Sequence, residues 1–192
     1  MTYTKKVIGL TGNTGSGKTT ICRILEEHNA YILNADTLAH KVLSGEASHD
    51  VLCAFGTICR KELGRIVFAD ESKRKKLESI IHPYVVNEIK AKINELQTSQ
   101  NAYAYIVIDA PLLIEAKLHL LADTTWVVSA DEEHRLNRIM ARDNISKQEA
   151  QARMSSQKAF CELAPYAHVI LENNGDLASL KEQVQQALGR RI

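Results

Sequence analysis

The sequence lacks the features that mark zinc-bound, secreted, membrane or nucleic-acid-binding proteins. Its four cysteines form no Cys-x-x-Cys pair and lie near no histidine pair at zinc-site spacing. No apolar run reaches the roughly 20 residues of a membrane-spanning helix, and none near the N-terminus resembles a signal peptide. The net charge of +1 lacks the basic excess usual in duplex-binding proteins. We therefore expect a cytoplasmic protein with neither a membrane nor a nucleic acid as partner.

What is present is the composition of an ordinary globular protein, with 45% hydrophobic and 24% charged residues. A chain of this length buries roughly 70% of its unfolded surface in one well-packed domain. We expect a single domain over residues 1–192 that acts as a monomer or a weak homo-oligomer. Cys22 falls on an apolar helical stripe, which predicts a reduced thiol in the core.

Short β-like runs alternate with helical patterns along the chain. The periodicity of apolar residues predicts buried strands at 7–10, 31–33, 105–108, 125–128 and 168–171. Between and after them it predicts helices that include 18–29, 37–43, 132–142 and 177–188. Strands that alternate with helices pair in parallel through right-handed crossovers. We therefore predict a three-layer α/β fold with a parallel five-stranded sheet.

A glycine-rich segment joins the first predicted strand to the first predicted helix and matches G-x-x-x-x-G-K-[ST]. A polyphosphate needs several converging backbone N–H groups, and glycines allow the backbone angles that bring them together. The helix that follows adds its unpaired N–H groups and the positive end of its dipole. Lys18 is placed to bridge the outer phosphates, and Thr19 to offer its hydroxyl to Mg²⁺. The segment predicts a site for MgATP made of Gly12, Asn13, Thr14, Gly15, Ser16, Gly17, Lys18, Thr19 and Thr20.

Two other classes of P-loop protein are disfavoured by motifs that the chain does not contain. A motor ATPase would carry Asp-Glu at the end of an apolar strand, whereas the strand at 105–108 is followed by Asp-Ala-Pro at 109–111. A GTPase would carry Asn-Lys-x-Asp and Asp-x-x-Gly, and neither occurs. A small-molecule kinase remains, which must align an acceptor hydroxyl with the γ-phosphate and exclude water.

Two aspartates that follow predicted strands are candidates for the chemistry. In a parallel sheet the carboxyl ends of the strands border the ligand crevice. We predict that Asp36 orients and deprotonates the acceptor hydroxyl, although an N-cap of the helix at 37–43 is an alternative role. Asp109 has two open interpretations: it reaches Mg²⁺ through a water molecule, or it caps a short helix after Pro111.

Three arginines recur at helical spacing in the region predicted to form a lid. Arg135, Arg138 and Arg142 share one face of the predicted helix. A solvated face is the common fate of surface arginines, but beside a phosphate loop we predict that Arg138 and Arg142 offset charge on the transferring phosphate. Arg153 and Gln157 lie at i and i+4 on the next predicted helix, and we assign them to the same lid.

A long, mostly helical insertion separates the second predicted strand from the third. Material inserted into an α/β core usually serves a second ligand. Pro83 should break or kink this insertion just after His82. The basic run at 73–76 is flanked by acidic residues, so it is interpreted as a solvated helix face.

Several separated segments together resemble the dephospho-CoA kinase family. They lie at 8–12, 34–36, 65–68, 77–83, 109–115, 138, 142–143, 153–157 and 173–175. The phosphate loop is generic, whereas the His-Pro segment at 82–83 and the Pro-Leu-Leu-x-Glu segment at 111–115 are far more specific. The resemblance implies transfer of the γ-phosphoryl group of ATP to the ribose 3′-hydroxyl of dephospho-CoA, the last step of coenzyme A biosynthesis. It also implies a P-loop kinase core (1–36, 101–131, 166–192), a helical acceptor-binding insertion (37–100) and a helical lid (132–165).

The residues themselves assign roles to Lys18, Thr19 and Asp109, and the resemblance assigns roles to the other positions. Catalysis falls to Asp36, Lys18 and Arg142, and Thr19 and Asp109 would hold Mg²⁺. Asn173 and Gly175 would border the adenine of ATP. The acceptor side would comprise Asp36, His82, Pro83, Leu112, Leu113 and Glu115.

The chain departs from the family's usual pattern at two places. Asn34 stands where the family usually has Asp, and the segment at 55–60 is several residues shorter than usual. Two alternative functions remain open: a kinase for a nucleoside or nucleoside monophosphate, and a catalytically weakened ATP-binding regulator. The identity of the phosphorylated product separates all three.

Overall fold

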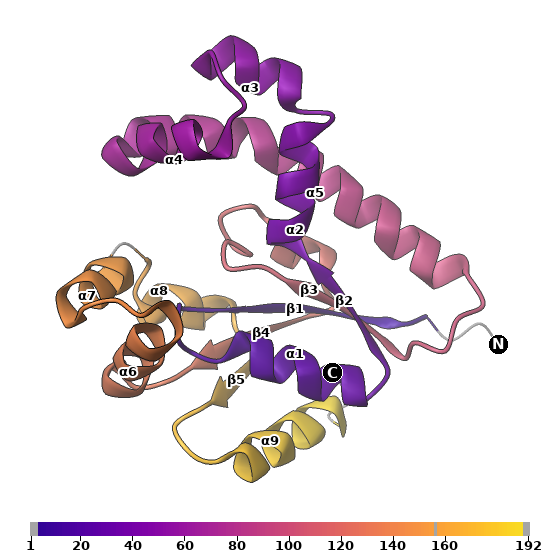
Figure 1. Cartoon of the computed structure of the whole chain (residues 1–192). Helices are drawn as coiled ribbons and strands as arrows, with labels where there is room; N and C mark the ends of the chain where they lie inside the picture. The colour runs from indigo at the N-terminus through magenta and orange to yellow at the C-terminus, as the bar shows by residue number, and fades with distance from the viewer. Residues whose placement is uncertain (1–3, 156, 190–192) are drawn as a thin grey trace. The chain divides into compact units, whose positions relative to one another are not determined.

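The computed structural model describes residues 4–155 and 157–189, and its strands lie where apolar runs predict them (Figure 1). They form one sheet in the order β2-β3-β1-β4-β5. Their bounds are β1 Lys6–Gly12, β2 Ala30–Asn34, β3 Tyr105–Asp109, β4 Thr124–Ser129 and β5 Val169–Glu172. The predicted parallel five-stranded sheet with helices on both sides is therefore confirmed.

The central strand, β1, is buried on both faces. Ile8 faces Val107 of β3 and Thr124 of β4 in the parallel register, and it is fully buried. On one face, helices α1 (Lys18–Glu27) and α9 (Leu177–Gly189) share a core with β1, β4 and β5. The apolar runs that predicted these strands are continuous because both faces of a parallel sheet are covered.

By the pattern of their contacts, the residues form two compact units. One contains the sheet and comprises the chain up to Leu33 together with the chain from Gln100 onward. The other runs from Asn34 to Ser99 and is all helical. Its helices are α2 (Ala35–Ser44), α3 (Ser48–Phe55), α4 (Arg60–Ala69) and α5 (Glu71–Thr98).

Pro83 is predicted to break or kink the insertion, but α5 does not end there, so the predicted break is wrong. The helix runs unbroken from Glu71 to Thr98, with α2, α3 and α4 packed against it. Proline in a helix interior removes one hydrogen bond and costs about 3 kcal/mol. Val85 and Ile89 are buried just beyond it, and burying each such side chain stabilises by about 1.5–3 kcal/mol. Packing therefore outweighs the local preference of proline.

The N-cap of α2 is Asn34 and not Asp36. The Asn34 Oδ1 atom accepts hydrogen bonds from the backbone nitrogen of Thr37 (2.8 Å) and from its hydroxyl (2.9 Å). Asn caps helices as well as Asp does. The alternative role of Asp36 as a cap is therefore wrong, and the Asp36 side chain is exposed in the first turn of the helix.

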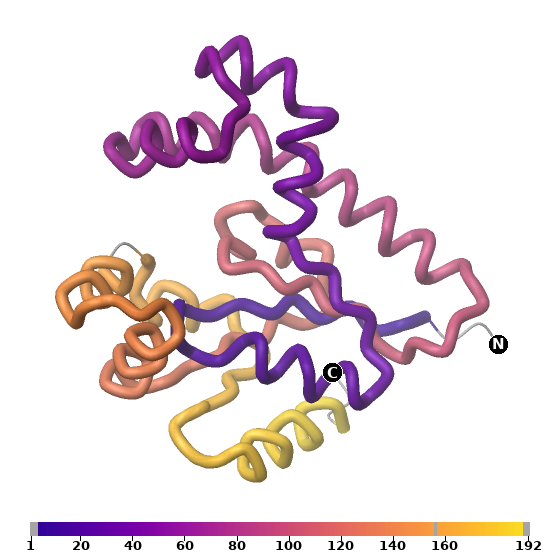
Figure 2. The backbone as a smooth tube through the Cα atoms, in the orientation of Figure 1, coloured from indigo at the N-terminus to yellow at the C-terminus, as the bar shows by residue number. Residues whose placement is uncertain are grey.

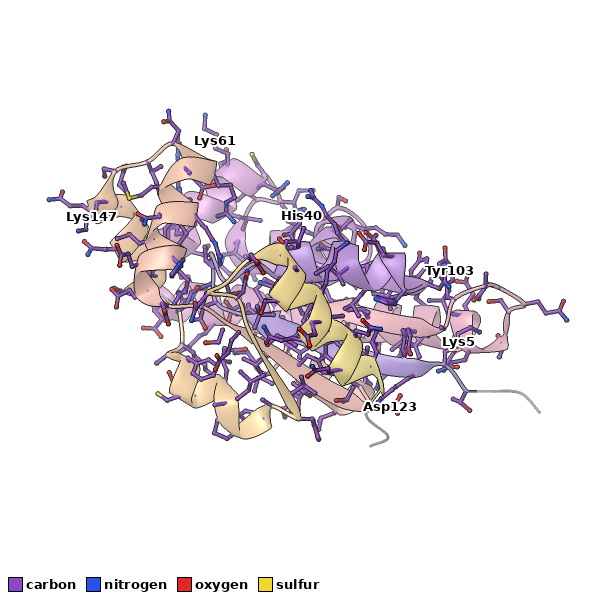
Figure 3. All side chains as sticks on the ribbon, turned by 90° about the horizontal axis from the view of Figure 1, so that it is seen from below. Lys5, His40, Lys61, Tyr103, Asp123 and Lys147 are labelled. Carbon is purple, nitrogen blue, oxygen red and sulfur yellow. The ribbon has the colours of Figure 1, made fainter. Side chains whose placement is uncertain are left out.

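Between β4 and β5 the chain forms a helical hairpin, which Figure 2 traces out and back. Helices α6 (Glu132–Asp143) and α7 (Lys147–Ser155) bury a small core of their own. The core consists of Leu136, Ile139 and Ala150, flanked by Met140, Ile145 and Met154. The short helices α8 (Phe160–Leu163) and η2 (Ala164–Tyr166) lead back to β5. Lys147 marks the outer end of the hairpin, and its side chain points into solvent (Figure 3).

The remaining helical segment of the sheet unit, η1 (Leu118–Leu121), precedes β4. Across the residues that the structure describes, no helix combines the length and the hydropathy needed to cross a membrane.

Candidate active site

The loop after β1 takes a conformation that only glycine allows at two positions. Gly15 and Gly17 have φ angles of 81° and 100°, in the left-handed region. A Cβ atom at Gly17 would lie 2.0 Å from the Nδ2 atom of Asn173, and one at Gly15 would lie 2.7 Å from the carbonyl oxygen of Arg135. The glycines of the predicted phosphate loop are therefore required both by backbone angle and by close packing.

The loop leads into an open helix N-terminus. Gly17 is the N-cap of α1, it offers no side-chain cap, and the first turn contains no acidic residue. The positive end of the helix dipole lies at this turn, where the Thr20 N–H donates to the carbonyl oxygen of Gly17 at 3.0 Å. The Lys18 ammonium lies back across the loop and donates to the carbonyl oxygen of Gly12 at 3.0 Å. Converging N–H groups and a nearby cation suit a polyanion.

Asn173 holds the phosphate loop through a hydrogen bond from its side chain. It follows β5, and its backbone nitrogen donates to the carbonyl oxygen of Ser129 at the end of β4 (2.8 Å). Its buried side-chain amide donates to the carbonyl oxygen of Ser16 at 2.7 Å. The predicted contact of Asn173 with adenine remains a prediction, as does that of Gly175, which is exposed between β5 and α9.

Two arginines of α6 also hold the loop through its carbonyl groups. Arg138 donates to the carbonyl oxygens of Gly15 (3.3 Å) and Asn173 (2.9 Å). Arg135 donates from Nε to the carbonyl oxygen of Thr14 at 3.0 Å. Burial lowers the pKa of the Arg135 guanidinium. Sequence reasoning gave Arg135 no role, because helical spacing shows that it shares a face with Arg138 but not what that face contacts.

The third arginine of the predicted lid face is held by its neighbour in sequence. Arg142 makes a bidentate ion pair with the carboxylate of Asp143, at 2.8 Å and 3.0 Å. Arg153 of α7 donates to the same carboxylate at 2.5 Å. The hydrogen bond from Arg142 lowers the pKa of Asp143, and the same bond raises the pKa of Arg142. The sequence pattern singled out both arginines but did not identify Asp143 as the group that joins them.

The segment after α7 also reaches the loop. The Gln157 side chain accepts a hydrogen bond from the backbone nitrogen of Thr14 (2.7 Å) and donates one to its hydroxyl (2.9 Å). The carbonyl oxygen of Lys158 accepts a hydrogen bond from the side chain of Asn13 at 2.7 Å. The Lys158 ammonium lies 3.4 Å from the carboxylate of Glu115. No local sequence pattern marks Lys158, so sequence reasoning missed it.

Asp109 lies at the carboxyl end of β3, opposite Leu10 in the register with β1. Its negative charge acts on the thiol of Cys22, which lies one turn beyond Lys18 on α1. Burial of Cys22, together with this carboxylate, raises the pKa of the thiol to about 12. The interpretation of Asp109 as a helix cap is wrong, because the N-cap of η1, the short helix after Pro111, is Lys117.

The Pro-Leu-Leu-x-Glu segment packs beside the end of β1. The Thr11 hydroxyl donates to the carbonyl oxygen of Pro111 at 3.2 Å. Leu112 is exposed, whereas Leu113 is fully buried and would contact a Cβ at Gly9. Leu113 can therefore serve an acceptor only through the backbone that it holds in place.

The other predicted acceptor residues belong to the helical unit. Asp36 is exposed in the first turn of α2. His82 is half-buried and Pro83 exposed near the middle of α5. The structure thus brings together Gly12–Thr20, Arg138 and Asn173 in the sheet unit, while Asp36, His82 and Pro83 lie in the other unit.

Comparison with known proteins places this arrangement in a family. A family model described as dephospho-CoA kinase matches residues 6–179. The chain belongs to the dephospho-CoA kinase family. The predicted family and the prediction of an ATP-dependent kinase are thereby confirmed.

Individual relatives and solved structures agree with this placement. A dephospho-CoA kinase of Carboxydothermus hydrogenoformans is 41% identical over 188 residues, which cover 93% of this chain and 90% of that protein. A solved dephospho-CoA kinase of Campylobacter jejuni superposes with a TM-score of 0.69 at 28% identity, with 96% of each chain covered. A solved protein of Thermus thermophilus superposes with a TM-score of 0.80 at 30% identity, again over 96% of each chain.

Proposed function

We propose that the protein transfers the γ-phosphoryl group of ATP to the ribose 3′-hydroxyl of dephospho-CoA and releases coenzyme A and ADP. The observation that carries the proposal is the glycine loop with its open helix end and Lys18, in a chain that belongs to the dephospho-CoA kinase family. ATP and dephospho-CoA are then its small-molecule substrates, and the protein acts in the cytoplasm.

The loop and its supports account for the binding of the triphosphate. Backbone N–H groups of the loop and the first turn of α1 would hold the phosphate oxygens, and Lys18 would bridge the outer two phosphates. The supports from Arg138 and Asn173 fix the loop before the ligand arrives, so little free energy is lost in ordering it.

The residues present fit a bound Mg²⁺. Among the described residues, no group of three or more His, Cys, Asp or Glu side chains is arranged to hold a metal. Mg²⁺ usually takes one or two protein oxygens and completes its shell with phosphates and water. The exposed Thr19 hydroxyl would ligate it directly and the Asp109 carboxylate through water. When bound, the ion would neutralise charge on the β- and γ-phosphates.

Three side chains carry the transfer in this proposal. The Asp36 carboxylate would orient the acceptor hydroxyl and take up its proton. Lys18 and Arg142 would offset the negative charge of the transferring group. Arg142 already has a fixed orientation on the carboxylate of Asp143, which lowers the entropy lost when the lid closes.

The remaining assignments concern the parts of the chain. Residues 1–192 act as one kinase domain, with a core, an acceptor-binding insertion (37–100) and a lid (132–165). The acceptor would lie against Asp36, His82, Pro83, Leu112, Leu113 and Glu115. Asn173 and Gly175 would border the adenine of ATP.

The identity of the phosphorylated acceptor tests the proposal. The protein is incubated with MgATP and, separately, dephospho-CoA, adenosine or AMP, and the products are analysed by mass spectrometry. A gain of one phosphoryl group on dephospho-CoA alone is the expected result. Phosphorylation of a nucleoside or nucleotide instead would identify a different acceptor, and tight ATP binding without any product would indicate a regulator.

A further inference from the structure

Thr14 is held on three sides by side chains from outside the loop. Gln157 accepts from its backbone nitrogen at 2.7 Å and donates to its hydroxyl at 2.9 Å. Arg135 donates from Nε to its carbonyl oxygen at 3.0 Å. The two peptide groups that flank Thr14 are therefore fixed in direction, one by Gln157 and the other by Arg135.

This arrangement determines which amides are left for phosphate. The N–H of Thr14 points to Gln157, so it does not contribute to the cradle. The Ser16 N–H is also engaged within the loop, by the carbonyl oxygen of Asn13 at 3.0 Å, so the cradle depends on other amides from Gly15 onward. Gly15 lies close to α6, since a Cβ there would lie 2.7 Å from the carbonyl oxygen of Arg135. The orientation of Thr14 therefore determines the direction of the next peptide groups, which form the phosphate-binding part of the loop.

The carboxamide of Gln157 comes from a segment that is itself anchored. The next residue, Lys158, accepts a hydrogen bond from the buried side chain of Asn13 at 2.7 Å. The Lys158 ammonium pairs with Glu115 at 3.4 Å. The backbone of Gln157 donates to the carbonyl oxygen of Met154 at the end of α7. The backbone on both sides of Gln157 is therefore held by hydrogen bonds, which fixes the position of its side chain against the loop.

A carboxamide suits this position because its oxygen only accepts and its nitrogen only donates. One atom matches the N–H of Thr14, and the other matches the lone pairs of its hydroxyl. We propose that Gln157 is a positioning residue for ATP: acting through Thr14, it holds the loop in its phosphate-binding form and links nucleotide affinity to the segment that ends the lid. The proposal rests on ATP being the phosphoryl donor, but not on the identity of the acceptor.

The direct test replaces Gln157 by methionine, which keeps the length of the side chain and removes both hydrogen bonds. Calorimetric titration of MgATP, with no acceptor present, should show affinity about thirtyfold weaker, the effect of losing two hydrogen bonds of ordinary strength. With acceptor, the KM for ATP should rise in proportion while kcat at saturating ATP stays within about twofold. Gln151→Met is the matched control, because Gln151 is exposed on α7 and should leave both values unchanged.

A double-mutant cycle shows whether the effect passes through Thr14. Thr14→Val removes the hydroxyl that Gln157 holds and should bind ATP several-fold more weakly. In the Gln157→Met background, Thr14→Val should have a much smaller effect, since the partner of the hydroxyl is already gone. Thr14→Val also decides the matter if Gln157→Met fails to fold, because unchanged ATP affinity in Thr14→Val would equally overturn the inference.

Unchanged ATP affinity in Gln157→Met, or fully additive effects in the cycle, would overturn the inference. Both outcomes are distinct from a failure of the proposed function. An acceptor other than dephospho-CoA would refute that function and leave the binding results of Gln157 and Thr14 standing.

Discussion

The side-chain nitrogen of Asn173 lies 2.7 Å from the carbonyl oxygen of Ser16, in the space that a side chain on the next residue of the loop would fill. The end of β5 is thereby joined to the phosphate loop. The contact ties residues 157 positions apart in the sequence, and it depends on the absence of a side chain at Gly17.

This contact makes Gly17→Ala a sensitive probe of the loop. The new Cβ would lie 2.0 Å from the Nδ2 atom of Asn173, and alanine at a φ of 100° is strained. We expect ATP affinity to fall at least about a hundredfold, because the loop must move away from the geometry that aligns its amides. Titration calorimetry measures the change. Gly64→Ala is the control, since a Cβ at Gly64 meets nothing closer than 4.0 Å, and wild-type-like affinity in Gly17→Ala would refute the described loop geometry.

Asp36→Asn should separate catalysis from stability. Asp36 is exposed and does not cap α2, so the free energy of unfolding should change by less than about 0.5 kcal/mol. Turnover should fall by about 10²- to 10⁴-fold, the usual contribution of a general base. Steady-state kinetics and thermal unfolding measure the two effects.

The matched control is Asp50→Asn, an exposed carboxylate of the same helical unit that accepts a hydrogen bond from the Tyr84 hydroxyl at 2.7 Å. It should keep wild-type turnover. Equal turnover in Asp36→Asn and the wild type would remove Asp36 from the mechanism.

Asp143 should govern turnover more than ATP affinity. Its carboxylate fixes Arg142 in a bidentate pair, and an amide cannot hold a guanidinium in that way. Asp143→Asn should therefore lower kcat by about three- to tenfold, because Arg142 must be ordered during closure. Asp131→Asn is the control. This carboxylate lies just before α6, where its neighbour is His134 at 3.9 Å and not Arg142. An unchanged kcat in Asp143→Asn would contradict the role given to Arg142.

The same ion pairs set an expectation for pH. The hydrogen bond from Arg142 lowers the pKa of Asp143 below its usual value, which is about 4 for a free aspartate. The pairs are complete above that usual value and are lost only as the pH falls through the depressed pKa. The titration of Asp143 should therefore cause no step in kcat between about pH 5 and about pH 9.

The four cysteines should differ in reactivity. Cys22 is buried, and burial together with Asp109 raises its pKa to about 12, so its thiol stays protonated at ordinary pH. Cys53, Cys59 and Cys161 are exposed. Alkylation of the native protein near pH 8 should label these three, and mass spectrometry after proteolysis should find Cys22 modified only in denaturant. Labelling of native Cys22 at the rate of the others would contradict its burial beside Asp109.

The parts predicted well from the sequence are those whose cause is local. Continuous apolar runs mark buried parallel strands, and the glycine pattern marks the phosphate loop. The break at Pro83 failed because burial of Val85 and Ile89 outweighs a local preference. The cap at Asp36 failed because Asn34 begins the helix two residues earlier.

The supports of the loop escaped prediction because they join distant positions. The hydrogen bonds that Arg135 and Gln157 make to Thr14 span 121 and 143 residues of sequence. Helical spacing shows which arginines share a face, but only the packing of α6 beneath the loop shows that Arg135 faces a carbonyl group and not solvent.

The central claim is that the glycine loop and Lys18 hold the triphosphate of ATP so that its terminal group passes to dephospho-CoA. The wild type and Lys18→Ala are each incubated with MgATP and dephospho-CoA, and coenzyme A is measured by mass spectrometry over time. The account predicts steady formation of coenzyme A by the wild type and a loss of orders of magnitude in Lys18→Ala without loss of fold. Absence of coenzyme A with the wild type, or equal rates in the two proteins, would contradict it.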